Sequence, residues 1–144
     1  MATATVVSML GARAALNALT ALFTGGAGTV EIRTGAPEAT TLTADSGTLL
    51  ATLTLSSTAF GASTDGTSNG LATATANSIT AATAGASGTA GHFRAKSNAG
   101  VVLAQGTCGT SGTDMILNST TITSGDLVTA TSWVITLPDG TGSD

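Results

Sequence analysis

Residues 6–23, VVSMLGARAALNALTALF, carry apolar side chains at intervals of three and four positions. This spacing is typical of an amphipathic helix, and the Gly25-Gly26 pair that follows favours its termination there. We therefore predict a helix over residues 6–23. Its stripe lies either on the domain's own sheet or on another subunit, and the pattern leaves both open. The members of the stripe are Met9, Ala12, Leu16, Leu19 and Phe23.

After Gly28 the period changes from 3.6 to 2, which indicates strands. Val30 and Ile32 alternate with Glu31 and Arg33. Residues 48–56, TLLATLTLS, alternate over a longer stretch and predict a half-buried strand. In that strand the inward positions are expected to be Leu49, Ala51, Leu53 and Leu55, with Leu50 as the exception on the other face.

Further strands are expected along the rest of the chain, separated by turn-forming sequences. Residues 34–47 are predicted to form a loop, and residues 57–70 a long link in which Phe60 packs inward. The remaining strand candidates are residues 71–82, 89–97, 115–122 and 127–138, the last with Trp133, Ile135 and Leu137 on one face.

Residues 89–106 are predicted to form a hairpin around the turn SNAG (97–100), since Asn and Gly tolerate positive φ. On its first strand Phe93 and Ala95 are expected to face the core. His92, Arg94 and Lys96 then point the other way and form a small basic stripe that faces outward.

Short strands with turn signals between them predict a mainly β fold. We expect a β-sandwich or jelly-roll-like domain of seven to eight antiparallel strands, preceded by one N-terminal helix. The expected organisation is a helix and linker over residues 1–28, the β-domain over residues 29–138, and a tail over residues 139–144.

The composition narrows the classes of partner. Thr, Ala and Gly account for 30, 26 and 19 of the 144 residues, and charged residues for 8%, against roughly 25% in soluble proteins. The four basic residues and the net charge of −4 make a nucleic-acid partner unexpected. No apolar run is long enough to span a bilayer, and no signal-peptide pattern is present, so no membrane association is expected.

Candidate chemistry is sparse. His92 as a general base would require a nearby nucleophile and an orienting carboxylate. Cys108 is the single cysteine, has no cationic neighbour in sequence to lower its pKa, and excludes an internal disulfide. The carboxylates are spread singly along the chain, and no metal-binding or phosphate-binding motif appears. We expect no catalytic residue, no cofactor and no metal site, and hence no enzyme.

Two stretches carry a family resemblance: residues 46–63, SGTLLATLTLSSTAFGAS, and residues 88–138, from GTAGHFRAKSNAG to WVITLP. They resemble a group of small virion proteins of tailed bacteriophages, and with EIRTGAP (31–37) the resemblance covers most of residues 29–138. Ser57-Thr58 depart from the pattern, where Asp-Pro is expected. The shared positions are glycines, turns and core residues, so they carry over no catalytic residues.

The resemblance implies a non-enzymatic structural protein of the virion. It favours a capsid decoration, or cement, protein with a jelly-roll-like fold on the capsid surface. Its expected partners are the major capsid protein and other copies of itself, as a dimer or trimer. A tail-associated structural or host-binding protein is the alternative. Candidate subunit contacts are Met9, Leu16, Leu19 and Phe23 on the helix, and His92, Arg94 and Lys96 on the basic stripe.

Overall fold

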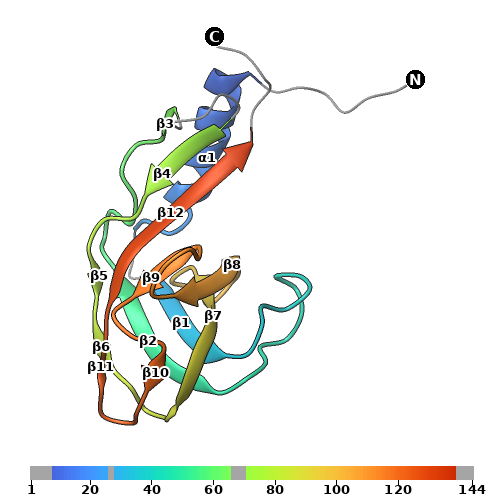
Figure 1. The fold of residues 1–144 in the computed structure, drawn as a ribbon. Helices are drawn as coiled ribbons and strands as arrows, with labels where there is room; N and C mark the ends of the chain where they lie inside the picture. Colours follow the sequence, from blue (N-terminus) through green and yellow to red (C-terminus); the bar gives the residue numbers. More distant parts are fainter. Residues whose placement is uncertain (1–7, 26–27, 66–70, 139–144) are drawn as a thin grey trace.

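The structure is a computed structural model that describes residues 8–25, 28–65 and 71–138. The predicted tail (139–144) and the first two residues of the predicted helix lie outside this part of the chain. The fold is mainly β with one N-terminal helix, as predicted (Figure 1). The strands are shorter and more numerous than the seven or eight expected. The elements are α1 (Met9–Ala21), β1 (Thr29–Thr34), β2 (Leu49–Leu55), β3 (Thr64–Asp65), β4 (Leu71–Thr75), β5 (Ile79–Thr80), β6 (Ala82–Thr83), β7 (Gly88–Lys96), β8 (Val102–Gly109), β9 (Met115–Leu117), β10 (Thr121–Ile122), β11 (Leu127–Val128) and β12 (Ala130–Pro138).

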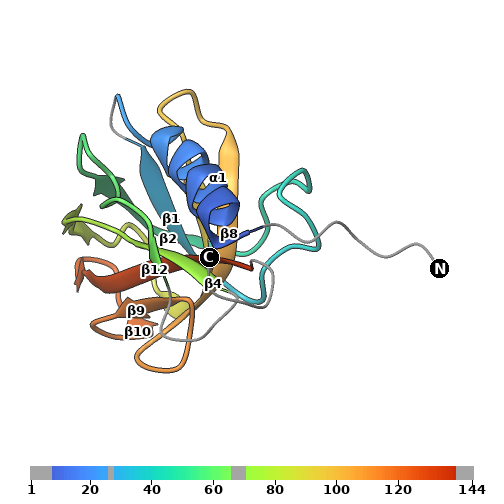
Figure 2. The same cartoon turned by 90° about the horizontal axis from the view of Figure 1, so that it is seen from above.

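One curled sheet dominates the molecule and gives it a sandwich-like form (Figures 1 and 2). The strand order is β3-β4-β12-β9-β8-β7-β1-β2-β5, with β10 beside β7, while β11 and β6 pair separately. Among the described strands, all pairs are antiparallel except β8 with β9. That parallel pair departs from the predicted all-antiparallel arrangement. It arises because residues 110–114 carry the chain back along β8, so that β9 enters the sheet in the same direction as β8.

The helix packs on its own sheet, which settles the question that the sequence left open. Ser8 caps α1 by accepting a hydrogen bond from the Gly11 N–H at 3.1 Å, as a helix N-cap serine does. The apolar stripe faces β4 and β12, and its Leu16 and Phe23 are buried. These two candidate subunit contacts therefore belong to the chain's own core. Leu19 is partly buried, and the side chain of Met9 lies outside what the structure describes.

An aromatic cluster forms the centre of the core. Trp133 on β12 contacts the rings of Phe23, Phe60 and Phe93 at centroid distances of 5.8, 4.8 and 5.2 Å. All three contacts are edge-on, a favoured geometry for aromatic pairs. The cluster joins the segment that follows α1, the link before β4, and the strands β7 and β12. The predicted inward positions of Phe60 and Trp133 are confirmed.

A β-bulge alters the face pattern expected for residues 48–56. Ile32 pairs with Ala51 but Arg33 pairs with Leu49, so Leu50 has no partner of its own on β1. An extra residue in a ladder moves the side chains beyond it to the other face. Leu50 is therefore buried and Leu49 is 39% exposed, the reverse of the predicted arrangement at these two positions.

Three of the predicted strands are each divided in the structure. Residues 71–82 break after β4, where Asn77 donates from Nδ2 to the Thr58 carbonyl at 2.7 Å. The predicted strands over residues 115–122 and 127–138 are interrupted at neighbouring positions. There Asn118 donates to the Leu127 carbonyl and accepts from the Thr129 N–H. Asn side chains that bond the backbone compete with the sheet ladder, which is why these strands end early.

Candidate functional site

The polar face of β1 and β7 carries the densest group of charged residues in the described part of the chain. The predicted hairpin is confirmed as β7 and β8, and Phe93 and Ala95 are in the core as predicted. On the opposite face, the antiparallel register pairs Glu31 with Arg94 and Arg33 with His92. Alternation along both strands thus collects acidic and basic side chains on one surface of the sheet.

This polar face is covered, so the predicted outward orientation of the basic stripe is wrong. His92 and Arg94 are both fully buried, and Lys96 is 15% exposed. The cover is the segment of residues 35–48, which we call the capping loop. Arg94 donates to the loop carbonyls of Thr43 and Thr41 at 2.7 and 2.8 Å.

Two loop carboxylates bring the opposite charges to the stripe. Asp45 lies 2.9 Å from Arg94 Nη1, 2.8 Å from Lys96 Nζ and 3.2 Å from Arg33 Nη2. Glu38 lies 3.3 Å from His92 Nε2, with its side chain 2% exposed.

Glu31, on β1, completes the charge balance. Its carboxylate lies 2.7 Å from Lys96 Nζ and 2.9 Å from Arg33 Nη2. Three carboxylates therefore face three permanent cations and one histidine. We call this group the ionic cluster: Glu31, Arg33, Glu38, Asp45, His92, Arg94 and Lys96.

The surroundings stabilise the charged forms of the loop carboxylates. Burial raises the pKa of Glu38, but hydrogen bonds from the Ser46 N–H and hydroxyl at 2.7 and 2.9 Å, together with the charge of His92, outweigh it and lower the pKa to about 2. The hydrogen bond and charge of Lys96 lower the pKa of Asp45. Burial lowers the pKa of Lys96, but Asp45 and Glu31 outweigh this and raise it. Glu38, Asp45 and Lys96 are therefore charged near neutral pH.

Two glycines let the capping loop approach the sheet closely. A Cβ at Gly91 would lie 2.2 Å from the Gly35 carbonyl oxygen. Gly47 has φ of +67°, and a Cβ there would lie 2.1 Å from the Thr34 carbonyl oxygen. Near both ends of the capping loop, the backbones therefore lie so close together that a residue with a Cβ does not fit.

The buried histidine has a structural role in this arrangement. His92 Nδ1 lies 3.0 Å from the Gly35 carbonyl, which can only accept, so the ring donates this hydrogen bond from Nδ1. Its other nitrogen faces Glu38. In the described structure no hydroxyl or thiol is hydrogen-bonded to the ring, and the ring is closed off from solvent. The cluster therefore holds the capping loop against the sheet.

The other candidate residues lie apart from the cluster. Cys108 is buried at the end of β8, and burial raises its pKa to about 11, so it is a thiol near neutral pH. No group of three or more His, Cys, Asp or Glu residues within the described segments could hold a metal ion. Nor does any helix in those segments combine the length and apolar character needed to cross a membrane.

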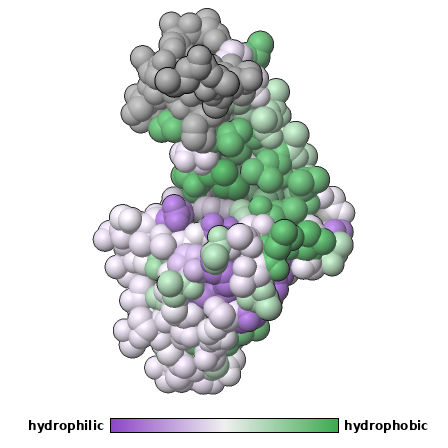
Figure 3. Space-filling model, turned by 90° about the vertical axis from the view of Figure 1, so that its right-hand side faces the viewer, coloured by the Kyte–Doolittle hydropathy of each residue, from purple (hydrophilic) through white to green (hydrophobic). Residues whose placement is uncertain are grey.

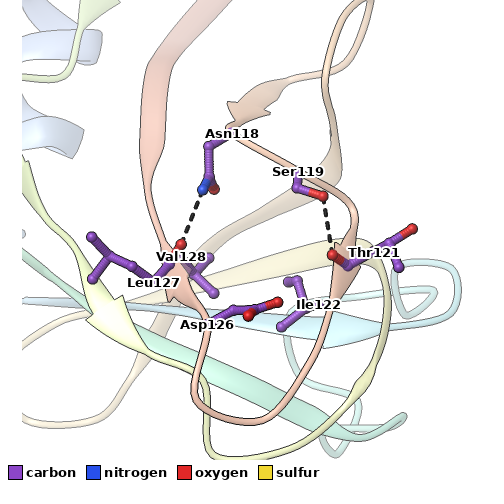
Figure 4. Close-up of a pocket in the computed structure, with 7 residues that line it drawn as sticks. All are labelled: Asn118, Ser119, Thr121, Ile122, Asp126, Leu127 and Val128. Atoms are coloured by element: carbon purple, nitrogen blue, oxygen red, sulfur yellow. Dashed lines mark hydrogen bonds between the residues drawn. The ribbon is translucent and has the colours of Figure 1, made fainter.

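A depression of about 290 Å³ between β10 and β11 is a second candidate (Figure 4). Its polar groups are engaged by the surrounding turns. Asn118 donates to Leu127, Ser119 donates to the Thr121 carbonyl, and Asp126 accepts from the Thr123 N–H at 2.8 Å. These side chains shape the local backbone, so the ionic cluster is the stronger site.

The acidic members of the cluster could not be assigned from the sequence as partners of the stripe. Glu31 and Arg33 sit two apart on a strand, which places them on one face, and this is the signal that was available. Glu38 and Asp45 lie in a segment with turn residues and no periodicity, so their positions depend on tertiary structure. The basic stripe was a candidate subunit contact, whereas its ion pairs in the structure are with Glu31, Glu38 and Asp45 of the same chain.

Comparison with protein families, with curated proteins and with solved structures gives no match to this chain.

Proposed function

We propose that the protein is a structural subunit of a tailed-bacteriophage virion, most specifically a capsid decoration protein that bridges and stabilises capsid subunits. The proposal starts from the sequence resemblance over residues 29–138. Its partners are the major capsid protein and further copies of the chain, without nucleic acid or membrane. It acts by binding and has no catalytic step.

The observation that carries this function is the capping loop. The ionic cluster fixes the loop on the sheet, while Leu42 near its centre is 95% exposed. A large apolar side chain on an immobilised loop loses little conformational entropy on binding. Such a side chain suits insertion into a pocket of a neighbouring protein.

The rest of the surface fits a role in an assembly. Three of the four basic residues are engaged in the ionic cluster. The fourth, Arg13, pairs with Asp65 at 3.5 Å. Thr, Ser, Ala and Gly elsewhere on the surface cost little to desolvate, and interface cores are depleted in charge. A decoration protein repeated over a capsid lattice gains avidity from many such weak contacts.

Immuno-electron microscopy of phage particles that carry this gene tests the location. Label spread over the head, with a copy number in the hundreds, supports the proposal. Label confined to the tail refutes capsid decoration and favours the tail-associated alternative. Absence of the protein from purified particles refutes both virion roles.

The role of the capping loop is tested by Leu42→Ser in a capsid-decoration assay. Burying a leucine is worth about 1.5–3 kcal/mol, so the variant should bind capsids at least about tenfold more weakly. Leu127→Ser is the matched control, because Leu127 is also exposed (60%) but lies on β11. Equal binding by both variants would show that the loop is not the contact.

A further inference from the structure

The imidazole ring of His92 lies between two groups that can only accept hydrogen bonds. Its Nδ1 lies 3.0 Å from the Gly35 carbonyl oxygen, and its Nε2 lies 3.3 Å from Glu38 Oε2. Although burial raises the pKa of Glu38, hydrogen bonds, chiefly from Ser46, lower it to about 2. The Glu38 carboxylate therefore has no proton to donate near neutral pH, and the ring meets an acceptor on each side.

The contact between Nε2 and Glu38 requires a further proton. A neutral imidazole carries one N–H, so with Nδ1 donating to Gly35, Nε2 would present a lone pair to the carboxylate oxygen. Among the described residues, neither His92 Nε2 nor Glu38 Oε2 has a hydrogen-bond partner, and the two side chains are 0% and 2% exposed. Two buried acceptors that face one another are costly, whereas a proton on Nε2 makes the contact a charge-assisted pair.

The charged groups around the ring leave Glu38 as its counter-ion. Arg33 is level with His92 on β1, Arg94 lies two residues along β7, and the residue level with His92 on β8 is uncharged. The two arginines oppose a positive ring, but each is paired with the Asp45 carboxylate. Arg94 Nη1 comes only within 3.8 Å of Glu38 Oε2, farther than Nε2 of the ring. The Glu38 carboxylate is thus placed to balance a second proton on His92.

Both acceptors belong to the capping loop. Gly35 begins the loop with a φ of +87°, and its carbonyl oxygen would lie 2.2 Å from a Cβ at Gly91, so this end of the loop lies directly on β7. Glu38 follows three residues later. When the loop opens, both acceptors leave the ring together, and His92 meets water, in which histidine titrates near about pH 6.5.

The loop covers the ionic cluster with small and weakly polar residues. Figure 3 faces the side on which the capping loop lies at the right of Figure 1, and the lower part of that face is mostly pale and purple, below a green zone. Within residues 35–48, Leu42 is the only large aliphatic residue. Opening of the loop would therefore change both the solvation of His92 and the placement of Leu42.

We propose that the capping loop is a proton-dependent latch, in which the docked loop holds His92 with a proton on each ring nitrogen, one donated to Gly35 and the other to Glu38. Opening of the loop separates the ring from both acceptors and releases the second proton to neutral or alkaline solution. The latch follows from the contacts of the loop and does not depend on the virion role. Where that role holds, the pH sets whether Leu42 is presented on a fixed or an open loop.

Docking of the loop then weakens as the pH rises. Below about pH 6.5 the ring is protonated in the open loop as well, so docking takes up no proton and is most favourable. Above that pH, docking takes up one proton, and the opening equilibrium rises by up to about tenfold per pH unit. The rise ends where the docked ring itself loses its second proton. Opening through protonation of Glu38 belongs to the acid range and is a separate event.

Nitrogen NMR of the ring tests the second proton directly. His92 is the only histidine of the chain, so one pair of ring nitrogen resonances is observed. At about pH 7.5, one unit above the ordinary titration of histidine, both resonances of the wild-type chain should lie in the range of protonated imidazole nitrogens. Glu38→Gln supplies an amide that can donate to Nε2, so its ring should be neutral at that pH. A wild-type ring with one unprotonated nitrogen, or a variant ring with two protonated ones, overturns the proposal.

Amide hydrogen exchange tests the release of the loop. After correction for intrinsic exchange rates, the opening of residues 35–48 in the wild-type chain should increase about fivefold between about pH 6.5 and 7.5. His92→Gln cannot take up the proton and should show no such increase. The turn at residues 123–126, which Asp126 holds outside the ionic cluster, is the internal control and should keep one opening equilibrium. A loop that opens equally at both pH values in the wild-type chain, or equally in wild type and His92→Gln, refutes the latch.

Discussion

Replacing Arg94 with methionine should release the capping loop while the sheet beneath it stays folded. Methionine keeps much of the volume of the arginine stem but removes the guanidinium. Arg94 is fully buried and contacts Thr41, Thr43 and Asp45 at 2.7–2.9 Å. These three contacts fasten the middle of the loop to β7, so their loss acts on the loop first.

The free-energy cost of this substitution depends on which interactions the partners of Arg94 retain after the guanidinium is removed. Breaking a buried ion pair costs about 3–5 kcal/mol because a charge is left unpaired. Asp45 retains Lys96 and Arg33, and the carbonyls of Thr41 and Thr43, which belong to exposed residues, regain water when the loop opens. These compensations place the cost at the lower end, about 3 kcal/mol. A free energy of that size corresponds to roughly 100-fold in the opening equilibrium of the loop.

Amide hydrogen exchange measures that opening directly. Amides of residues 35–48 should exchange roughly 100-fold faster in Arg94→Met than in wild type, while those of β1 and β7 change less. Arg13→Met is the matched control, because the Arg13–Asp65 pair is 41% and 55% exposed and such pairs are worth about 0–1 kcal/mol. Equal protection of the loop in both variants would refute the role assigned to the ionic cluster.

Three further predictions concern pH, packing and the thiol. The pKa of Glu38 is about 2 in the folded chain against 4.5 ordinarily, so its stabilising effect is complete above about pH 5 and is lost as the pH falls towards 2. Loop opening measured by exchange should therefore rise over that window, by up to about 3 kcal/mol before solvent screening reduces it, and Glu38→Gln should flatten the profile. Gly91→Ala should lower the free energy of unfolding by about 1–3 kcal/mol through its clash with Gly35, whereas Gly85→Ala, with no atom within 4 Å of its Cβ, should leave thermal melts within about 0.5 kcal/mol of wild type. Because burial raises the pKa of Cys108 to about 11, thiol reagents at pH 8 should label it only after denaturation, and rapid labelling of the native chain would contradict its burial.

Local periodicity was sufficient to predict much of the fold. The helix, β2, the β7–β8 hairpin and the inward position of Trp133 all follow from spacings of two, three or four residues. The failures occurred where side chains act on distant backbone. Asn118 ends two strands by bonding across to residues 127 and 129, and the bulge at Leu50 depends on its pairing with β1. Neither contact is visible in a short window of sequence.

In the ionic cluster, too, local strand geometry could be predicted from the sequence, whereas contacts between distant segments could not. Alternation along residues 92–96 correctly separated Phe93 from its polar neighbours, because that follows from strand geometry alone. Whether a polar face meets water or another segment depends on where loops fold. Glu38 and Asp45 lie 49 or more residues away in sequence from the stripe residues that they contact, and no pattern within the loop indicates these contacts.

Charged residues make up only 8% of this chain, yet many of them lie together in the ionic cluster. Six of the charged residues, Glu31, Arg33, Glu38, Asp45, Arg94 and Lys96, are engaged beneath or within one loop. Buried ion pairs seldom stabilise a fold more than apolar packing would, but they fix geometry. The guanidinium of Arg94 contacts two loop carbonyls and the Asp45 carboxylate, and these directional contacts specify where the middle of the loop lies. We infer that the position of the loop matters more than its contribution to stability. Under the function proposed above, Leu42→Ser and Arg94→Met should both weaken capsid binding, but by different routes: the first removes the contact and the second its orientation.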